Sequence, residues 1–228
     1  MADKGLIEYL SSVITEKRFL QIQDVLHNRT RYLTVVLEDI FQSQNASAVL
    51  RTCDCFGIQD VHIIENKNEY NINPDVVQGA SKWLSLNYYN ERENNTLEVI
   101  KKLKADGYRI VATTPHTNDV NLEEFDISAG KTALIFGTEL TGISETVTEN
   151  ADEFLKIPMN GFTESLNISV SAAIILHHLV YKLNESDVDW KLSPEETEDM
   201  LLNWLRITVK KSQLVEKRYY RDLNRSHK

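Results

Sequence analysis

Residues 157–178 read IPMNGFTESLNISVSAAIILHH, and this stretch indicates the fold more clearly than any other part of the chain. It joins a short apolar strand, predicted over 154–157, to a long apolar helix predicted over 167–183. Backbone N–H groups at a helix start have no partners within the helix and can bind a ligand. The turn around Leu166 is therefore predicted to face a ligand, while Asn167 is equally suited to cap the helix.

Two upstream stretches carry comparable turns. QNASAVLR at 44–51 opens a predicted helix, and IFGTELTGIS at 135–144 follows a predicted strand. Glycines let the backbone bend sharply and approach a ligand closely, which favours a binding loop in the second stretch. Taken alone, each stretch has a plainer explanation, in which Asn45 caps the helix, Arg51 is a solvated helical arginine and Glu139 is solvated in a turn.

Apolar runs and helical periods alternate along the middle of the chain. Strands are predicted at 33–37, 61–64, 108–112, 132–136 and 154–157, and helices at 45–57, 97–105 and 167–183. This alternation is typical of an α/β domain built on a mainly parallel sheet, where ligands bind beyond the carboxyl ends of the strands. The loops after Phe136 and Ile157 fall at those ends.

The length of 228 residues fits one sizeable core with terminal extensions. We expect an N-terminal helical extension over 1–30, a central domain over 31–184 and a basic, helical C-terminal extension over 185–228. The first extension is predicted to be helical over 6–27. In the last, Ser193 is predicted to cap a helix that has proline in its first turn.

Composition excludes several classes of protein. Apolar residues make up 42% of the chain and charged residues 26%, which is ordinary for a globular protein and unlike a disordered one. The N-terminus lacks a secretory pattern, and the longest apolar run, 172–176, is far shorter than the roughly 20 residues of a membrane span. We therefore expect a soluble, cytoplasmic protein without a membrane partner. The two cysteines, Cys53 and Cys55, are too few for a zinc site, and no metal is expected.

The formal net charge of −9 weighs mildly against a nucleic-acid partner, because phosphate binding favours a basic surface. The distribution of charge weakens that objection. From Arg206 the chain reads RITVKKSQLVEKRYYRDLNRSHK, which is clearly basic. By itself this segment fits a solvated helix face as well as it fits an RNA-binding surface.

The chain contains no G-x-G-x-x-G, Walker loop, H-E-x-x-H or G-x-S-x-G motif. The three stretches instead resemble, as an ordered set, the signature motifs of the SPOUT superfamily, in its SpoU/TrmH branch of RNA ribose 2′-O-methyltransferases. The resemblance covers about residues 33–183. It implies a SPOUT fold whose C-terminal third forms a deep trefoil knot, where ordinary winding rules predict an unknotted doubly wound sheet.

The resemblance also implies a cofactor, S-adenosyl-L-methionine, and the residues that serve it. Cofactor contacts are expected at Thr113, Gly137, Ile157, Met159 and Leu166. Catalytic positions are expected at Arg51, Asn45, Glu139, Ser165 and Asn167. In the family the adenosine is held largely by backbone groups, and the arginine is proposed to activate the ribose hydroxyl.

Arginine is effectively never deprotonated in proteins, because its pKa exceeds about 12. We therefore expect Arg51 to position the ribose and stabilise charge while it is bonded to an RNA phosphate that accepts the proton. Methyl transfer from a sulfonium then gains much of its rate from the in-line placement of oxygen, carbon and sulfur.

Among the RNA substrates of this family, tRNA is the one that we expect for this chain. Relatives that act on ribosomal RNA commonly carry a globular N-terminal RNA-binding domain, whereas here only about thirty residues precede the first predicted strand. The short N-terminus and basic C-terminus resemble the branch that methylates guanosine 18 in the tRNA D-loop. The alternatives are another tRNA position, ribosomal RNA, or a catalytically silent RNA-binding module.

Contacts with RNA are expected at Lys182, Lys210, Lys211, Lys217, Arg218 and Arg221. Three departures from the family pattern bear on this grip: Gln44 in place of histidine, His178 in place of glutamate, and residues 181–183 in place of Arg-x-Arg. Family members pair through the knot region and its helix, here 167–183. A homodimer is therefore expected, in which Arg51 serves the active site of the opposite subunit.

Overall fold

The chain folds into two compact units in the computed structural model, in which residues 2–115, 119–138 and 141–226 are described. The central unit is Thr30–Trp190, and the terminal unit combines Met1–Arg29 with Lys191–Lys228. The two extensions expected as separate segments thus belong to one unit.

The structure also moves one expected boundary, because residues 185–190 belong to the central unit. Val188 and Trp190 pack against its core. The Thr30 hydroxyl donates a 2.6 Å hydrogen bond to the carbonyl oxygen of Trp190. This bond ties the two ends of the central unit together.

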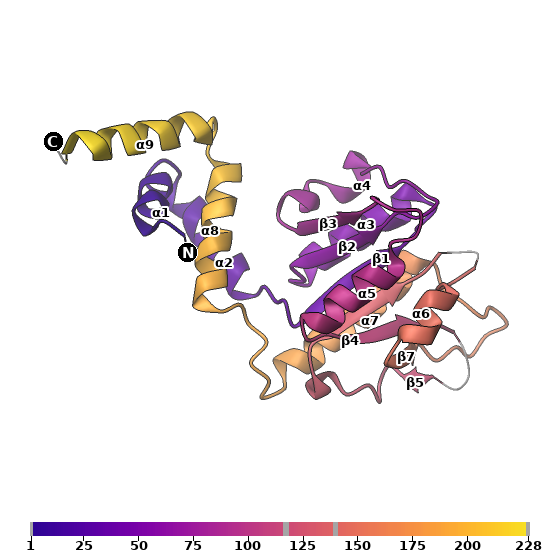
Figure 1. Ribbon diagram of the computed structural model, residues 1–228. Coiled ribbons are helices and arrows are strands. Elements are labelled where there is room, and N and C mark those ends of the chain that lie inside the picture. Colours follow the sequence, from indigo (N-terminus) through magenta and orange to yellow (C-terminus); the bar gives the residue numbers. More distant parts are fainter. Residues whose placement is uncertain (1, 116–118, 139–140, 227–228) are drawn as a thin grey trace. The chain divides into compact units, whose positions relative to one another are not determined.

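Within the described residues, a seven-stranded sheet runs through the central unit in the order β3-β2-β1-β6-β4-β7-β5 (Figure 1). Every pairing between these strands is parallel. The strands are β1 Leu33–Glu38, β2 Asp60–Ile64, β3 Ser85–Tyr89, β4 Arg109–Thr113, β5 Val120–Asn121, β6 Thr132–Phe136 and β7 Glu153–Lys156. The expected α/β architecture on a mainly parallel sheet is confirmed, while the trefoil knot stays a prediction.

Helices cover both faces of this sheet. They are α3 Ser43–Cys55, α4 Pro74–Val77, α5 Thr96–Ala105, α6 Glu145–Asn150 and α7 Ile168–Asn184, with short 3₁₀ turns η1 Ala80–Lys82 and η2 Ile127–Ala129. Helices α3 and α7 contribute to one core layer, and α5 and α6 contribute to the other. In β1, Val35 faces the first layer and Val36 the second, because successive strand side chains point to opposite faces. Burial on both faces explains why the strands read as continuous apolar runs.

Two strands escaped the sequence prediction, β3 and β5, and both lie at the edges of the sheet. Strand β3, with sequence SLNYY, is half-exposed along most of its length and lacks an apolar run. The helix predicted over 6–27 is in fact two helices. The Thr15 side chain accepts a hydrogen bond from the Arg18 backbone N–H and thereby caps the second helix. The first helix therefore ends before Thr15.

The terminal unit consists, in its described part, of four helices: α1 Lys4–Ser11, α2 Glu16–His27, α8 Pro194–Thr208 and α9 Ser212–Ser226. The predicted start of α8 is confirmed, and Ser193 and Glu196 form a reciprocal capping box there. The Arg29 guanidinium lies 5.1 Å from the centre of the Trp204 ring, and the rings of Tyr9 and Tyr219 lie 5.3 Å apart. These contacts join both ends of the chain.

None of the described helices is both long and apolar enough to cross a membrane. Of the two cysteines, Cys53 is buried in α3 and Cys55 is exposed.

Candidate functional site

A cavity of about 570 Å³ opens at the carboxyl ends of β4, β6 and β7. Eight of the residues predicted from the sequence line it, and they come from all three motif stretches and from β4. They are Asn45, Thr113, Gly137, Ile157, Met159, Ser165, Leu166 and Asn167. The fold therefore gathers stretches that lie far apart in the chain at the edge of the sheet where ligands bind in α/β proteins.

The loop after β6 forms one wall of the cavity. Thr138 and Gly142 exchange backbone hydrogen bonds of 2.9 and 3.0 Å, which folds the loop back on itself. A Cβ atom at Gly137 would overlap the carbonyl group of Gly142, so only glycine permits this approach. Glu139, the catalytic candidate in this loop, lies outside the described residues.

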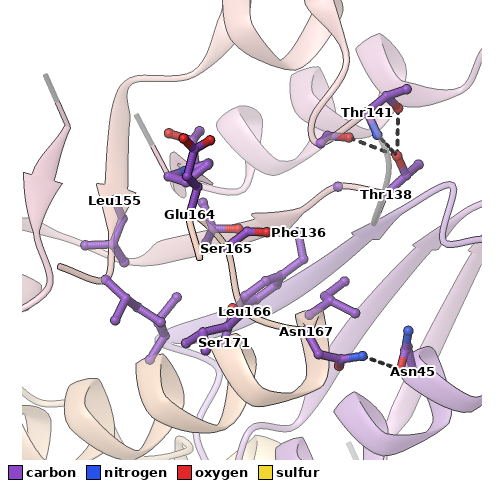
Figure 2. A pocket seen from close by; sticks show the side chains of 18 of the residues that line it. Asn45, Phe136, Thr138, Thr141, Leu155, Glu164, Ser165, Leu166, Asn167 and Ser171 are labelled. Atoms are coloured by element: carbon purple, nitrogen blue, oxygen red, sulfur yellow. Dashed lines mark hydrogen bonds between the residues drawn. The ribbon is translucent and has the colours of Figure 1, made fainter. Parts of the chain in front are cut away.

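Asn167 caps α7, as its sequence position suggested, and also joins two of the motifs, while its catalytic role stays a prediction. Its Oδ1 accepts a 2.8 Å hydrogen bond from the Ser169 backbone N–H and thereby caps α7. Its Nδ2 donates to Oδ1 of Asn45 at 3.1 Å, a bond that joins the first and third motifs (Figure 2).

Asn45 is not the cap of α3, because that helix begins at Ser43 and Gln42 occupies the capping position. Asn45 is buried with only 8% of its surface exposed. Its Nδ2 donates a 3.2 Å hydrogen bond to Oε1 of Gln42. A line of amides, Gln42–Asn45–Asn167, therefore runs along the cavity and fixes the direction of each side chain.

The lining fits an adenosine-containing ligand. The side chains of Met159 and Leu166 are partly exposed at the cavity and offer apolar contact. Within the described residues, the backbone N–H of Leu166 donates to no other group. The Thr113 hydroxyl donates a 3.0 Å hydrogen bond to the carbonyl oxygen of Ile135. The volume also falls in the range of about 300–1,000 Å³ that is usual for small-molecule sites.

The lining residues that were not predicted include three polar ones, Gln42, Glu164 and Ser171. Each lies close in sequence to a predicted residue, and Ser171 follows Asn167 by about one helical turn, which places both on one face of α7. Glu164 is the only charged side chain among the described residues that line the cavity.

Arg51 lies outside this group. It is exposed on α3, about two turns after Asn45, and does not line the cavity of its own chain. The two ends of α3 thus differ: its first turn contributes to the cavity and its last turns present Arg51 to the surroundings.

The predicted RNA-binding cations fall into two groups. The Lys182 ammonium donates to the carbonyl oxygens of Phe125 at 2.7 Å and Glu123 at 3.1 Å, so it holds the chain before η2. Its contact with RNA stays a prediction. The other five are exposed near or on α9 in the terminal unit: Lys210, Lys211, Lys217, Arg218 and Arg221.

Helix α7 presents a narrower apolar surface than the sequence indicated. Ile175, Leu176 and Leu179 are buried in the core of their own chain. The side chains left exposed on α7 include Val170, Ile174, His177 and Tyr181, which recur at helical spacing along one face.

Within the part of the chain that the structure describes, no group of three His, Cys, Asp or Glu side chains could hold a metal ion.

Comparisons with known proteins all match this chain to one family. Residues 32–177 match the model of the SpoU rRNA Methylase family. A protein of Borreliella burgdorferi named tRNA (guanosine(18)-2'-O)-methyltransferase is 48% identical over 92% of this chain and 94% of its own length. A protein of the same name from Aquifex aeolicus is 33% identical over 87% of this chain and 92% of its own length.

Solved structures agree with the sequence matches. The crystal structure of the A. aeolicus TrmH/SpoU tRNA modifying enzyme superposes with a TM-score of 0.75 at 32% identity, covering 86% of this chain and 98% of that one. The methyltransferase AviRb of Streptomyces viridochromogenes, solved with AdoMet, shares the fold with a TM-score of 0.60 at 22% identity, over 72% of this chain and 65% of that one.

Proposed function

The chain belongs to the SpoU rRNA methylase family, and from this premise we propose that it methylates the ribose 2′-hydroxyl of guanosine 18 in tRNA with S-adenosylmethionine. The observation that carries the proposal is the meeting of all three motif stretches at one cavity, linked by the Asn45–Asn167 hydrogen bond. The choice of tRNA rests on the Borreliella and Aquifex relatives, which match nearly their whole length.

The cavity residues have distinct parts in this proposal. S-adenosylmethionine, when bound, supplies an electrophilic methyl group on a sulfonium. The backbone N–H of Leu166 and the backbone near Ile157 hold the adenosine, while Thr113, Gly137 and Met159 line the space around it. Their contribution is binding and exclusion of water, which strengthens every polar contact inside the cavity.

The amides of Asn45 and Asn167 orient the ribose, and Ser165, two residues before Asn167, lines the same cavity (Figure 2). Each amide has its direction fixed by a neighbour, so little reorganisation is needed when substrate binds. Glu139 is proposed as another polar group of the site because of its position in the second motif stretch.

Arg51 is proposed to act on the substrate as a positioning group. The guanidinium keeps its charge, binds ribose and phosphate together through its planar fork, and leaves the proton to the phosphate oxygen. Because Arg51 does not line its own chain's cavity, we propose that it serves the cavity of a second copy.

We propose that this second copy forms a homodimer through α7. The exposed residues Val170, Ile174 and Tyr181 form an apolar stripe on a helix whose remaining apolar side chains are buried or partly buried. Ile174→Glu should place a charge in this stripe and shift the protein to a monomer in light scattering at micromolar concentration. A dimer of unchanged stability in this variant would contradict the interface.

Subunit mixing tests whether Arg51 works across the dimer. Arg51→Ala and Asn167→Ala are each expected to be inactive alone. A mixed dimer of the two contains one site with both residues intact if Arg51 comes from the opposite chain. Activity should therefore return on mixing, whereas an arginine that serves its own chain would give no recovery.

The proposed function has a direct test. The protein is titrated with S-adenosylmethionine by calorimetry and then assayed on a tRNA transcript with guanosine at position 18. Transfer should occur on this transcript and be absent on one carrying 2′-deoxyguanosine there. Transfer only to ribosomal RNA, or only to another tRNA position, would replace the substrate. Binding of RNA without any transfer would indicate a silent module. We place the enzyme in the cytoplasm, where such an RNA substrate is available.

A further inference from the structure

Glu38, at the carboxyl end of β1, is a buried carboxylate that the proposed mechanism does not use. Only 3% of its surface is exposed. Its Oε1 accepts hydrogen bonds from the hydroxyls of Ser144 at 2.6 Å and Thr96 at 2.8 Å. Its Oε2 accepts from the backbone N–H of Ser144 at 2.9 Å. Two of the three bonds thus go to one residue, Ser144.

Each of the two hydroxyls that donate to Glu38 is oriented by a second hydrogen bond. The Ser144 hydroxyl oxygen accepts from the backbone N–H of Val147 at 3.2 Å, and the Thr96 hydroxyl oxygen accepts from Nδ2 of Asn66 at 2.9 Å. Each hydroxyl therefore has its proton available for Glu38. The carboxylate faces three donors, an arrangement that a group able only to accept satisfies best.

Ser144 ends the loop that forms one wall of the cavity. It caps α6, and the residues before it include Gly137, Thr138, Thr141 and Gly142, all of which line the cavity. The loop is closed on itself by the paired backbone bonds of Thr138 and Gly142. A Cβ atom at Gly137 would overlap the Gly142 carbonyl, so the start and the end of the loop lie close together.

We propose that Glu38 is a positioning residue that holds this loop in its cofactor-binding shape by fixing Ser144 to the end of β1. The inference rests on the proposed function for the identity of the cofactor, but not for the effect on the loop. Leaving a buried donor without an acceptor costs more free energy than the hydrogen bond contributes. The attachment of Ser144 to Glu38 is therefore sensitive to the change of a single atom.

Glu38→Gln tests the proposal with almost no change of shape. One carboxylate oxygen becomes an NH₂ group, so either the Ser144 backbone N–H or the hydroxyl protons of Ser144 and Thr96 lose their acceptor. We expect the affinity for S-adenosylmethionine, measured by calorimetry, to fall about tenfold. The KM for the cofactor should rise by a similar factor, while kcat and the KM for tRNA at saturating cofactor stay within about twofold.

Hydrogen exchange in the free protein gives a readout that needs no cofactor. In Glu38→Gln, the amides of Gly142, Ile143 and Ser144 should exchange faster than in the wild type. If the wild type does not bind S-adenosylmethionine, the proposed function fails, yet this measurement still decides the role of Glu38.

Thr96→Val is the matched control. It removes a donor to the same carboxylate from the side of α5, leaving both bonds to Ser144. It should destabilise the fold by a comparable amount but leave cofactor affinity and loop exchange unchanged. Ser144→Ala removes one anchor bond and should reproduce the effect of Glu38→Gln, which keeps the test open if that variant fails to fold. The proposal would be overturned if Thr96→Val lowered cofactor affinity as much as Glu38→Gln does. It would also be overturned if Glu38→Gln and Ser144→Ala both kept normal cofactor affinity and normal amide exchange.

Discussion

The central and terminal units differ most in charge. The central unit carries 12 basic and 24 acidic residues, whereas the terminal unit carries 13 basic and 10 acidic residues. The whole-chain charge of −9 is therefore the sum of a basic unit and a strongly acidic one. Long-range attraction to phosphate follows local charge, so the net charge of a chain is a poor guide to nucleic-acid binding.

The two units also differ in how they hold their functional groups. In the cavity of the central unit, buried amides such as Asn45 are fixed by neighbours within hydrogen-bond distance. In the terminal unit, the cations of α9 are exposed, and Arg218 and Arg221 form ion pairs with the surface carboxylate of Asp222. Chemistry at one atom requires side chains that are fixed by hydrogen bonds, whereas attraction to a polyanion requires only exposed charges.

The largest expected effect concerns Arg51. Arg51→Ala should lower methyl transfer by more than about a hundredfold, because misplacement of the reacting groups removes the benefit of in-line geometry. Cofactor affinity should remain within about twofold, since Arg51 is proposed to contact the ribose and phosphate of the RNA and not the cofactor. Single-turnover transfer to tRNA and calorimetry with S-adenosylmethionine measure the two quantities.

Arg51→Lys sharpens the same comparison. Lysine keeps the charge but loses the planar fork, so a positioning role predicts low activity at every pH. Substantial rescue that grows with pH would instead identify a general base, because lysine loses its proton more readily than arginine. Wild-type activity in Arg51→Ala would remove Arg51 from the site.

A smaller effect is expected from the terminal unit. Changing Lys210, Lys211 and Lys217 together to alanine should weaken tRNA binding about tenfold and reduce the salt dependence of binding by roughly 0.9 per lost phosphate contact. Cofactor affinity should not change. Filter binding of tRNA across a salt series measures both effects.

The control for this prediction removes the same charge from the central unit. Helix α5 carries three exposed lysines on the sheet face opposite α3 and α7: Lys101, Lys102 and Lys104. Their triple alanine variant should bind tRNA almost as well as the wild type. Equal weakening in both variants would mean that general charge matters and that the terminal unit has no special part.

The smallest effect is expected at the start of α8. Ser193→Ala removes the capping box and should lower stability by about 1 kcal/mol. Urea unfolding followed by circular dichroism measures this loss. Cofactor affinity should stay unchanged because the change lies in the terminal unit. Weaker cofactor binding in Ser193→Ala would show that the two units depend on each other more than their separate cores suggest.

Much of the fold could be predicted because it depends on local patterns. The continuous apolar runs of β1 and β6 indicate strands buried on both faces, and the start of α8 follows from a serine before proline. The edge strand β3 was missed because it buries too little surface to need an apolar run. Its pairing with β2 supplies the stability that its own sequence does not indicate.

The sequence by itself determined most of the elements, the family and eight residues of the cavity, because motif residues and periodicity are properties of short stretches. Only the tertiary structure decided that Asn45 bonds to Asn167 and that Arg51 lies outside the cavity. It also decided that the Lys182 ammonium binds two carbonyl oxygens and that Glu38 holds Ser144. These contacts join residues far apart in the chain, and their partners depend on how strands and helices pack, which no local pattern specifies.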